Sequence, residues 1–112
     1  MHRRAVAAAL LVTIGAIACD AEDQTALKRY GRHLAAECTA CHRGDGANGA
    51  IPSLAGRPET EIIGLLQDFR SGRKTNPVMV SVAKSLDERQ SAALAAYFSS
   101  LPGSAPTAAA PR

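Results

Sequence analysis

The chain has 112 residues, which is enough for one domain but not for two, and so small a domain usually needs a disulfide, a metal or a cofactor for its stability. It contains no Trp, two Tyr and two Phe, so its own side chains make only a thin core. The formal charge of +3 falls to +1 without Arg3 and Arg4, and the other basic residues are scattered, which argues against a nucleic-acid-binding protein.

The N-terminus has the pattern of a secretory signal peptide. Basic residues at positions 2–4 precede an apolar run at 5–18, which ends in an A-x-A cleavage pattern at 16–18. This run is shorter than the roughly 20 residues that a transmembrane helix needs, although an uncleaved anchor is the alternative. We therefore expect residues 1–18 to be a signal peptide and the mature protein to be exported to the periplasm, an oxidising compartment.

A first helix is predicted after a short acidic tether at residues 19–24. Its apolar and small residues recur at helical spacing and share one face, and Asp23 or Thr25 can cap its start. The residues of this face are Leu27, Tyr30, Gly31, Leu34 and Cys38. The glycine-rich segment 44–56 is then predicted to be a loop, and a loop of this length in a small domain is usually functional.

Two more amphipathic helices are predicted further along the chain. Pro58 suits the first turn of one of them, and Gly72 follows its end. Segment 73–79 is predicted to be a loop and segment 80–84 a short helical turn, and residues 85–88 (Ser-Leu-Asp-Glu) have the form of a capping box that opens the last helix. The apolar faces of the two helices are Ile62, Leu65, Leu66 and Phe69, and Leu94, Tyr97, Phe98 and Leu101.

The last helix is predicted to end at Pro102. Residues 102–112 are rich in Ala and Pro and are expected to be a disordered tail. No segment alternates between apolar and polar residues with the period of a strand. The sequence therefore predicts one all-α domain at residues 25–101.

Residues 38–42 read Cys-Thr-Ala-Cys-His, which is the C-x-x-C-H pattern of c-type haem attachment. Two thiols one helical turn apart can each add to a vinyl group on one edge of a porphyrin, and the next residue presents an imidazole to the iron. Cys38 and Cys41 are therefore the predicted attachment sites of one covalent haem c. His42 is the predicted axial ligand of its iron.

Three other interpretations of the two cysteines remain open. A thioredoxin-type redox pair expects a βαβ unit, for which the sequence gives no strands. A zinc site needs four ligands, and outside the motif and the leader only His33 and Cys19 are good candidates. A structural disulfide between Cys38 and Cys41 is possible but strained. His33 is otherwise expected to be a surface residue.

The second axial ligand of the haem is predicted to be Met79. It is the one methionine beyond the start codon, and it follows Pro77 in a predicted loop between helices. Ligation by histidine and methionine is a known way to raise the potential of a haem in cytochromes c. The alternative is that Met79 only fills space in the core.

Together these features resemble the class I bacterial cytochromes c. The resemblance covers residues 25–101 and rests on the haem motif, on Pro-Ser-Leu-Ala-Gly at 52–56, on Pro-Val-Met at 77–79 and on the closing helix that ends at 94–101. It implies a small all-α fold, in which three main helices and loops wrap around one haem. It also implies that the first and last helices cross.

A narrower resemblance comes from segments 31–36 and 49–56, which are similar to the haem subunit of flavocytochrome c sulfide dehydrogenase and to one half of the related dihaem cytochromes. With one haem motif, this chain is not dihaem by itself. In that family the residue at Pro52 offers its backbone carbonyl to the distal nitrogen of the haem-binding histidine, which fixes the orientation of the imidazole. The resemblance also makes Gly31 and Tyr97 the candidate pair at the helix crossing.

The function that this resemblance implies is electron transfer, with no catalytic chemistry required of the protein. One alternative is a haem-bearing, electron-accepting subunit of a flavoprotein dehydrogenase of the sulfide dehydrogenase type. Another is a five-coordinate haem protein that binds a diatomic gas or peroxide, against which Met79 argues. The expected partners are redox proteins: a donor dehydrogenase or flavoprotein, and an acceptor oxidase or reductase.

The third cysteine, Cys19, makes the number of cysteines odd. Ala-Ile-Ala-Cys at residues 16–19 resembles a bacterial lipobox, in which the cysteine becomes the mature N-terminus and carries lipid. The alternative is ordinary cleavage, which leaves a reactive thiol in an oxidising compartment. Lipid on Cys19 would anchor the protein to a membrane.

Overall fold

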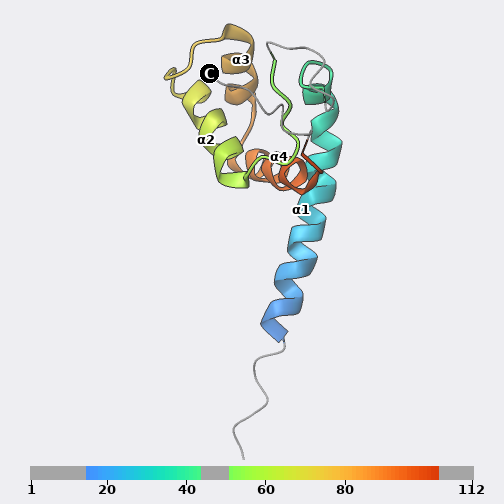
Figure 1. The fold of residues 1–112 in the computed structure, drawn as a ribbon. Helices are drawn as coiled ribbons and strands as arrows, with labels where there is room; N and C mark the ends of the chain where they lie inside the picture. The colour runs from blue at the N-terminus through green and yellow to red at the C-terminus, as the bar shows by residue number, and fades with distance from the viewer. Residues whose placement is uncertain (1–14, 44–50, 104–112) are drawn as a thin grey trace, which may run out of the picture.

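The computed structural model describes residues 15–43 and 51–103, and these residues form four helices and no strand (Figure 1). The helices are α1 (Gly15–Thr39), α2 (Glu59–Arg70), α3 (Pro77–Ser85) and α4 (Glu88–Ser100). The predicted all-α class is therefore confirmed for this part of the chain. Most of the predicted leader, the middle of the glycine-rich loop and most of the predicted tail lie outside the described residues.

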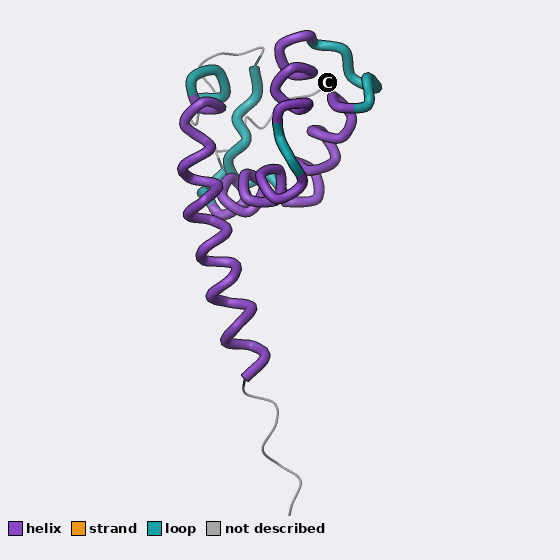
Figure 2. Tube along the Cα trace, turned by 180° about the vertical axis from the view of Figure 1, so that it is seen from behind, coloured by secondary structure: helices purple, strands orange, loops and turns teal. Residues whose placement is uncertain are grey.

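Helix α1 is longer than predicted. It begins at Gly15 rather than at Thr25, so residues 19–24 are part of the helix. Three of residues 15–21 are alanine, the strongest helix former, which favours a helix at the start of α1. In Figures 1 and 2 the N-terminal half of α1 extends away from the other helices, and only its C-terminal half crosses α4. The division into signal peptide, tether and domain remains a prediction.

The core forms where α1 and α4 cross. Gly31 of α1 lies against Ala93 and Tyr97 of α4, so closely that a Cβ atom at position 31 would come within 2.8 Å of Tyr97 Cβ. This contact confirms the predicted pairing of Gly31 with Tyr97. The buried apolar side chains of the described residues are mostly alanine, and they are Ala35, Ile62, Ala83, Ala93, Leu94, Ala95, Ala96 and Phe98.

Helix α2 packs against α4 and α3. Pro58 is the residue that precedes its first turn, one position earlier than predicted. Its end agrees with the prediction, because Gly72 follows the last turn with a positive φ of 82° and donates to the Phe69 carbonyl. The buried Ile62 joins α2 to the core cluster at the α1–α4 crossing.

Helix α3 begins earlier than predicted, which moves Met79 out of the loop and into a helix. Asn76 caps α3 by accepting a hydrogen bond from the Met79 N–H at 3.1 Å, and Pro77 occupies the first helical position. Proline has its φ already set for a helix and lacks the N–H that would be unpaired there. The predicted short turn at 80–84 is therefore the second half of a nine-residue helix.

The capping box of α4 starts at Asp87 and not at Ser85. The Asp87 carboxylate accepts from the Gln90 N–H at 2.8 Å, and the Gln90 side chain accepts from the Asp87 N–H at 2.9 Å. Ser85 is the last residue of α3, and its hydroxyl is occupied with the Val82 carbonyl at 2.6 Å. The prediction was therefore wrong about the residue that caps the helix, although a capping box is present.

Helix α4 connects the two sides of the molecule. It contacts both α1 and α2, and α2 contacts α3, whereas α1 contacts neither α2 nor α3 within the described residues. Both views place α3 and the C-terminal end of α1 at the same end of the molecule, opposite the projecting N-terminal half of α1 (Figures 1 and 2). Among the described residues, α4 is therefore the helix that links the C-terminal half of α1 to the α2–α3 pair.

Candidate functional site

The Cys-x-x-Cys-His motif lies at the C-terminal end of α1, where the helix closes into a tight turn. Cys38 and Thr39 are the last two residues of the helix. The Cys38 carbonyl accepts hydrogen bonds from the backbone N–H of Cys41 at 3.2 Å and of His42 at 2.8 Å. These two bonds hold the two cysteines and the histidine within one turn of backbone.

The imidazole of His42 is oriented by a backbone carbonyl. Its Nδ1 lies 2.7 Å from the Pro52 oxygen. A carbonyl oxygen can only accept, so Nδ1 carries the proton, and Nε2 is left with the lone pair that can bind a metal. The contact is the one that the family resemblance implied for Pro52.

The segment that carries Pro52 is fixed by contacts to α4. Gly56 has a φ of 75°, which favours glycine, and its N–H donates to the Phe98 carbonyl at 2.9 Å. Leu54 packs against the core cluster, and the Ala55 N–H donates to the Ser53 hydroxyl at 3.3 Å. The loop is therefore held to the same helix that crosses α1.

The two cysteines differ in their surroundings. Cys38 is half-buried and packs against the core cluster, whereas Cys41 is exposed. Burial raises the pKa of the Cys38 thiol, and the neighbouring Glu37 carboxylate raises it further. Cys38 is a free thiol, so it is not joined to Cys41 in a disulfide.

Neither a zinc site nor a thioredoxin-type unit finds support in the described residues. No three His, Cys, Asp or Glu side chains of this part of the chain are placed to hold a metal ion together. His33, the predicted surface histidine, is indeed exposed on α1. The side chain of Cys19 lies outside the described part, and residues 51–103 and 15–43 contain no strand for a βαβ unit.

Met79 lies on α3, at the same end of the molecule as the haem motif but on a helix that does not contact α1. Its side chain is partly buried. The cap on its backbone N–H fixes the start of α3. The structure thus brings His42 and Pro52 together, and it places Met79 on the separate α2–α3 unit.

The chemistry of the residues present fits a flat, apolar group attached at the Cys-x-x-Cys-His motif. No large side chain among the described residues is fully buried, and alanine dominates the core. Several apolar side chains of α2 and α3 remain partly exposed and do not pack against the core cluster, namely Leu65, Phe69, Val80 and Val82. A covalently attached haem requires two thiols, an imidazole with Nε2 available and apolar side chains such as these.

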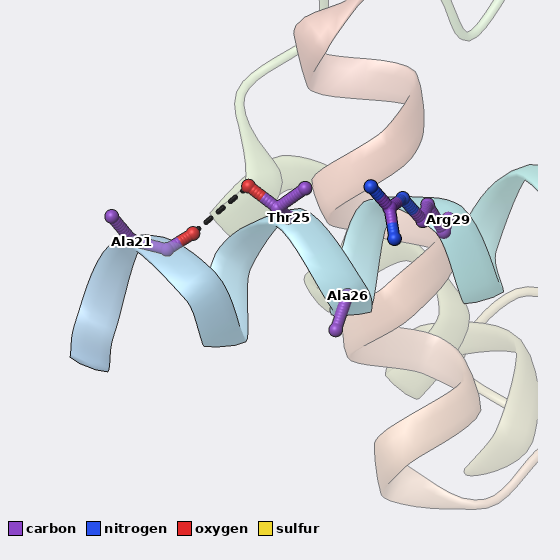
Figure 3. A pocket seen from close by; sticks show the side chains of 4 residues that line it. All are labelled: Ala21, Thr25, Ala26 and Arg29. Carbon is purple, nitrogen blue, oxygen red and sulfur yellow. Dashed lines mark hydrogen bonds between the residues drawn. The ribbon is translucent and has the colours of Figure 1, made fainter. Parts of the chain in front are cut away.

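A hollow lies away from the motif, on the projecting half of α1, and Figure 3 shows it from close by. It is lined by Ala21, Thr25, Ala26 and Arg29, and the Thr25 hydroxyl donates to the Ala21 carbonyl at 2.9 Å. It contains no predicted site residue. This hollow is therefore separate from the candidate site.

No family model matches the chain, but curated relatives do. The chain is 40% identical over 84 residues to a thiosulfate dehydrogenase electron acceptor from Thiomonas intermedia, an alignment that covers 68% of this chain and 39% of the relative. It is 36% identical over 95 residues to cytochrome c4 from Pseudomonas aeruginosa, and that alignment covers 81% of this chain and 45% of the relative. It is 35% identical over 72 residues to the cytochrome subunit of sulfide dehydrogenase from Chlorobaculum tepidum, and that alignment covers 63% of this chain and 66% of the relative.

The chain spans less than half the length of the first two relatives and about two thirds of the third. Two of the three are cytochromes by name, and the other is the electron acceptor of a dehydrogenase. The resemblance to cytochromes c that the sequence motifs indicated is thereby confirmed. The chain is related to the bacterial cytochromes c.

Proposed function

We propose that this protein transfers electrons through one covalently bound haem c. The observation that carries the proposal is the turn at the end of α1, in which His42 donates from Nδ1 to the Pro52 carbonyl at 2.7 Å. This hydrogen bond points the lone pair of Nε2 away from Pro52 and keeps it available for iron. The similarity to cytochromes c supports the same assignment.

Cys38 and Cys41 are the proposed attachment sites. Each thiol would add across one vinyl group of the haem, with the sulfur bonded to one vinyl carbon and the hydrogen to the other. The reaction needs no external oxidant. The half-buried Cys38 and the exposed Cys41 present their thiols from a single turn, which matches two vinyl groups on one edge of the ring.

His42 and Met79 are the residues that would hold the haem iron. The two residues come from elements that do not contact each other, at the same end of the molecule. A flat group that lies between those elements can receive a ligand from each. When bound, the haem supplies a one-electron couple at its iron, whose potential depends on the axial ligands and their hydrogen bonds.

The rest of the chain holds these ligands in place and covers the ring. Helix α4 fixes α1 against the loop of Pro52, and apolar side chains of α2 and α3 exclude water from the neighbourhood of the ring. A rigid site changes little when the iron changes charge, which favours fast electron transfer.

A second candidate function is that of an electron-accepting subunit of a dehydrogenase. The relatives favour it, since two of those described here are named as an electron acceptor or a cytochrome subunit of a dehydrogenase. In that case a flavoprotein is the proposed donor. Copurification of a flavin-containing chain under mild conditions supports this function, and recovery of a monomeric cytochrome alone supports a free carrier.

We place the mature protein in the periplasm, exported by the signal peptide at residues 1–18. No helix in residues 15–43 and 51–103 is both long and apolar enough to cross a membrane. Lipid on Cys19 is the proposed means by which the protein is anchored, and the lipobox-like sequence at 16–19 supports it.

The proposal is tested by extracting the purified protein with acid and acetone. Haem bound through thioethers stays with the chain, and the intact mass includes it. Cys38→Ala and Cys41→Ala should each weaken or abolish haem attachment, whereas the matched variant Cys19→Ser should retain it. Clean extraction of haem from the wild type would refute covalent attachment.

A further inference from the structure

The Pro52 carbonyl needs a support of its own if it is to orient His42. The side chain of Pro52 is exposed, so packing of this residue does not fix the direction of its carbonyl. Its φ is fixed by the ring, but the peptide group that contains its carbonyl can still turn about the neighbouring bonds. Some contact close to Pro52 must hold that peptide group in place.

Arg57 makes this contact. Its Nε donates to the Ser53 carbonyl at 3.0 Å, and its Nη1 lies 2.6 Å from Glu61 Oε1. Glu61 belongs to the first turn of α2. The guanidinium therefore connects the loop of Pro52 to the start of α2.

The position of the contact matters for His42. The Ser53 carbonyl belongs to the peptide group directly after the one that contains the Pro52 carbonyl. Each peptide group is planar and the two groups meet at the Ser53 Cα, so holding the second group fixes the atom to which the first is attached. A restraint on Ser53 is thus a restraint on the direction of the Pro52 oxygen.

We propose that Arg57 is a positioning residue for His42: it holds the loop so that the Pro52 carbonyl accepts the Nδ1 proton. This inference rests on the proposed function, in which Nε2 of His42 binds the haem iron. A stronger hydrogen bond at Nδ1 makes Nε2 a better donor to iron and stabilises the ferric state. Arg57 thereby acts on the potential of the haem through the loop and the imidazole.

The guanidinium is suited to this task for geometric reasons. It is planar and offers donors in a fixed fork, so one side chain can bind the Ser53 carbonyl and the Glu61 carboxylate together. A lysine at this position keeps the charge but has no second donor group at the place of Nε. The side chain of Arg57 is 32% exposed, compared with 78% for Arg73, whose partner is Asp68 at 3.3 Å.

The test compares variants of the haem-loaded protein in its reduced, diamagnetic state. NMR measures how fast the His42 Nδ1 proton exchanges with solvent, and voltammetry measures the potential. In Arg57→Lys and Arg57→Gln we expect exchange to become faster by about tenfold, as for the loss of one hydrogen bond. In Arg57→Lys, which keeps the net charge, the potential should rise. Arg73→Gln is the control, with an ion pair of the same type far from the loop, and should leave the exchange rate unchanged.

Unchanged exchange in Arg57→Lys would overturn the proposal, and so would an equal change in Arg73→Gln. If the Arg57 variants do not bind haem, Glu61→Gln decides instead, because it removes only the carboxylate that steadies the guanidinium. In Glu61→Gln, a smaller but measurable rise in the exchange rate of the Nδ1 proton supports the proposal. An unchanged exchange rate in this variant refutes it. Loss of haem from the wild type in acid and acetone refutes the proposed function itself, and the role of Arg57 with it.

Discussion

Replacing Gly31 with alanine tests the helix crossing on which the site depends. A Cβ atom at position 31 would lie 2.5 Å from the Ala93 carbonyl carbon and 2.8 Å from Tyr97 Cβ, whereas ordinary contacts begin at 3.4 Å. The obstacle includes the backbone of α4, which cannot turn aside as a flexible side chain can. The two helices must therefore separate by about 1 Å, which moves α1 and its haem motif relative to α4.

The expected cost follows from two opposing effects. Overpacking costs about 1–3 kcal/mol, and a clash with backbone belongs at the upper end of that range. Alanine gains about 0.5–1 kcal/mol over glycine inside a helix. We therefore expect Gly31→Ala to lower the free energy of unfolding by about 2 kcal/mol, which corresponds to a fall in Tm of roughly 8 °C or more for a domain of this size.

Gly64→Ala is the matched control for this experiment. Gly64 lies inside α2, and a Cβ atom built there meets nothing within 4 Å. Only the helical preference should then change, so this variant should gain about 0.5–1 kcal/mol. Urea unfolding of the haem-loaded protein, followed by circular dichroism, measures the free energy of unfolding of both variants. Wild-type stability of Gly31→Ala, or an equal loss in Gly64→Ala, would show that the crossing is not closely packed.

Three further predictions concern the iron, the cap of α4 and the N-terminus. Met79→Ala should lower the potential, remove the near-infrared band of a methionine–ferric bond and let carbon monoxide bind; an unchanged spectrum would leave Met79 a packing residue. Asp87→Ala should cost about 1 kcal/mol in urea unfolding, and Ser85→Ala much less, whereas the reverse order would contradict the capping box. Cys19→Ser should move the protein from the membrane to the soluble periplasmic fraction, and acyl groups should be absent from its N-terminal mass; a wild type that is already soluble and unacylated would exclude the lipoprotein.

Features that depend on a few neighbouring residues were predicted correctly. The helix end at Gly72 and the apolar face of α4 follow from local patterns. The crossing at Gly31 and the hydrogen bond from His42 to Pro52 came from the family resemblance, since no periodicity in the sequence connects residues that lie ten or more positions apart.

The errors arose where one residue type suits two roles. The sequence predicts that Pro77 lies in a loop, yet after Asn76 it begins α3, and Met79 is helical. The sequence predicts Ser85 as the cap of α4, although Asp87 is an equally good capping residue two positions later. Sequence alone could not choose between these registers, because the choice depends on where the preceding helix ends.

The role of Arg57 could not have been found from the sequence. An arginine four residues before a glutamate at the start of a helix is the pattern of an ordinary surface ion pair, which contributes little to stability. What makes this pair different is the Ser53 carbonyl, which accepts from Arg57 Nε at 3.0 Å where the loop turns at Gly56. That turn requires the positive φ of Gly56 and its hydrogen bond to Phe98, a residue more than forty positions away. The contacts that support the proposed axial ligand His42 therefore depend on the tertiary fold. The local Cys-x-x-Cys-His motif identifies only His42 itself.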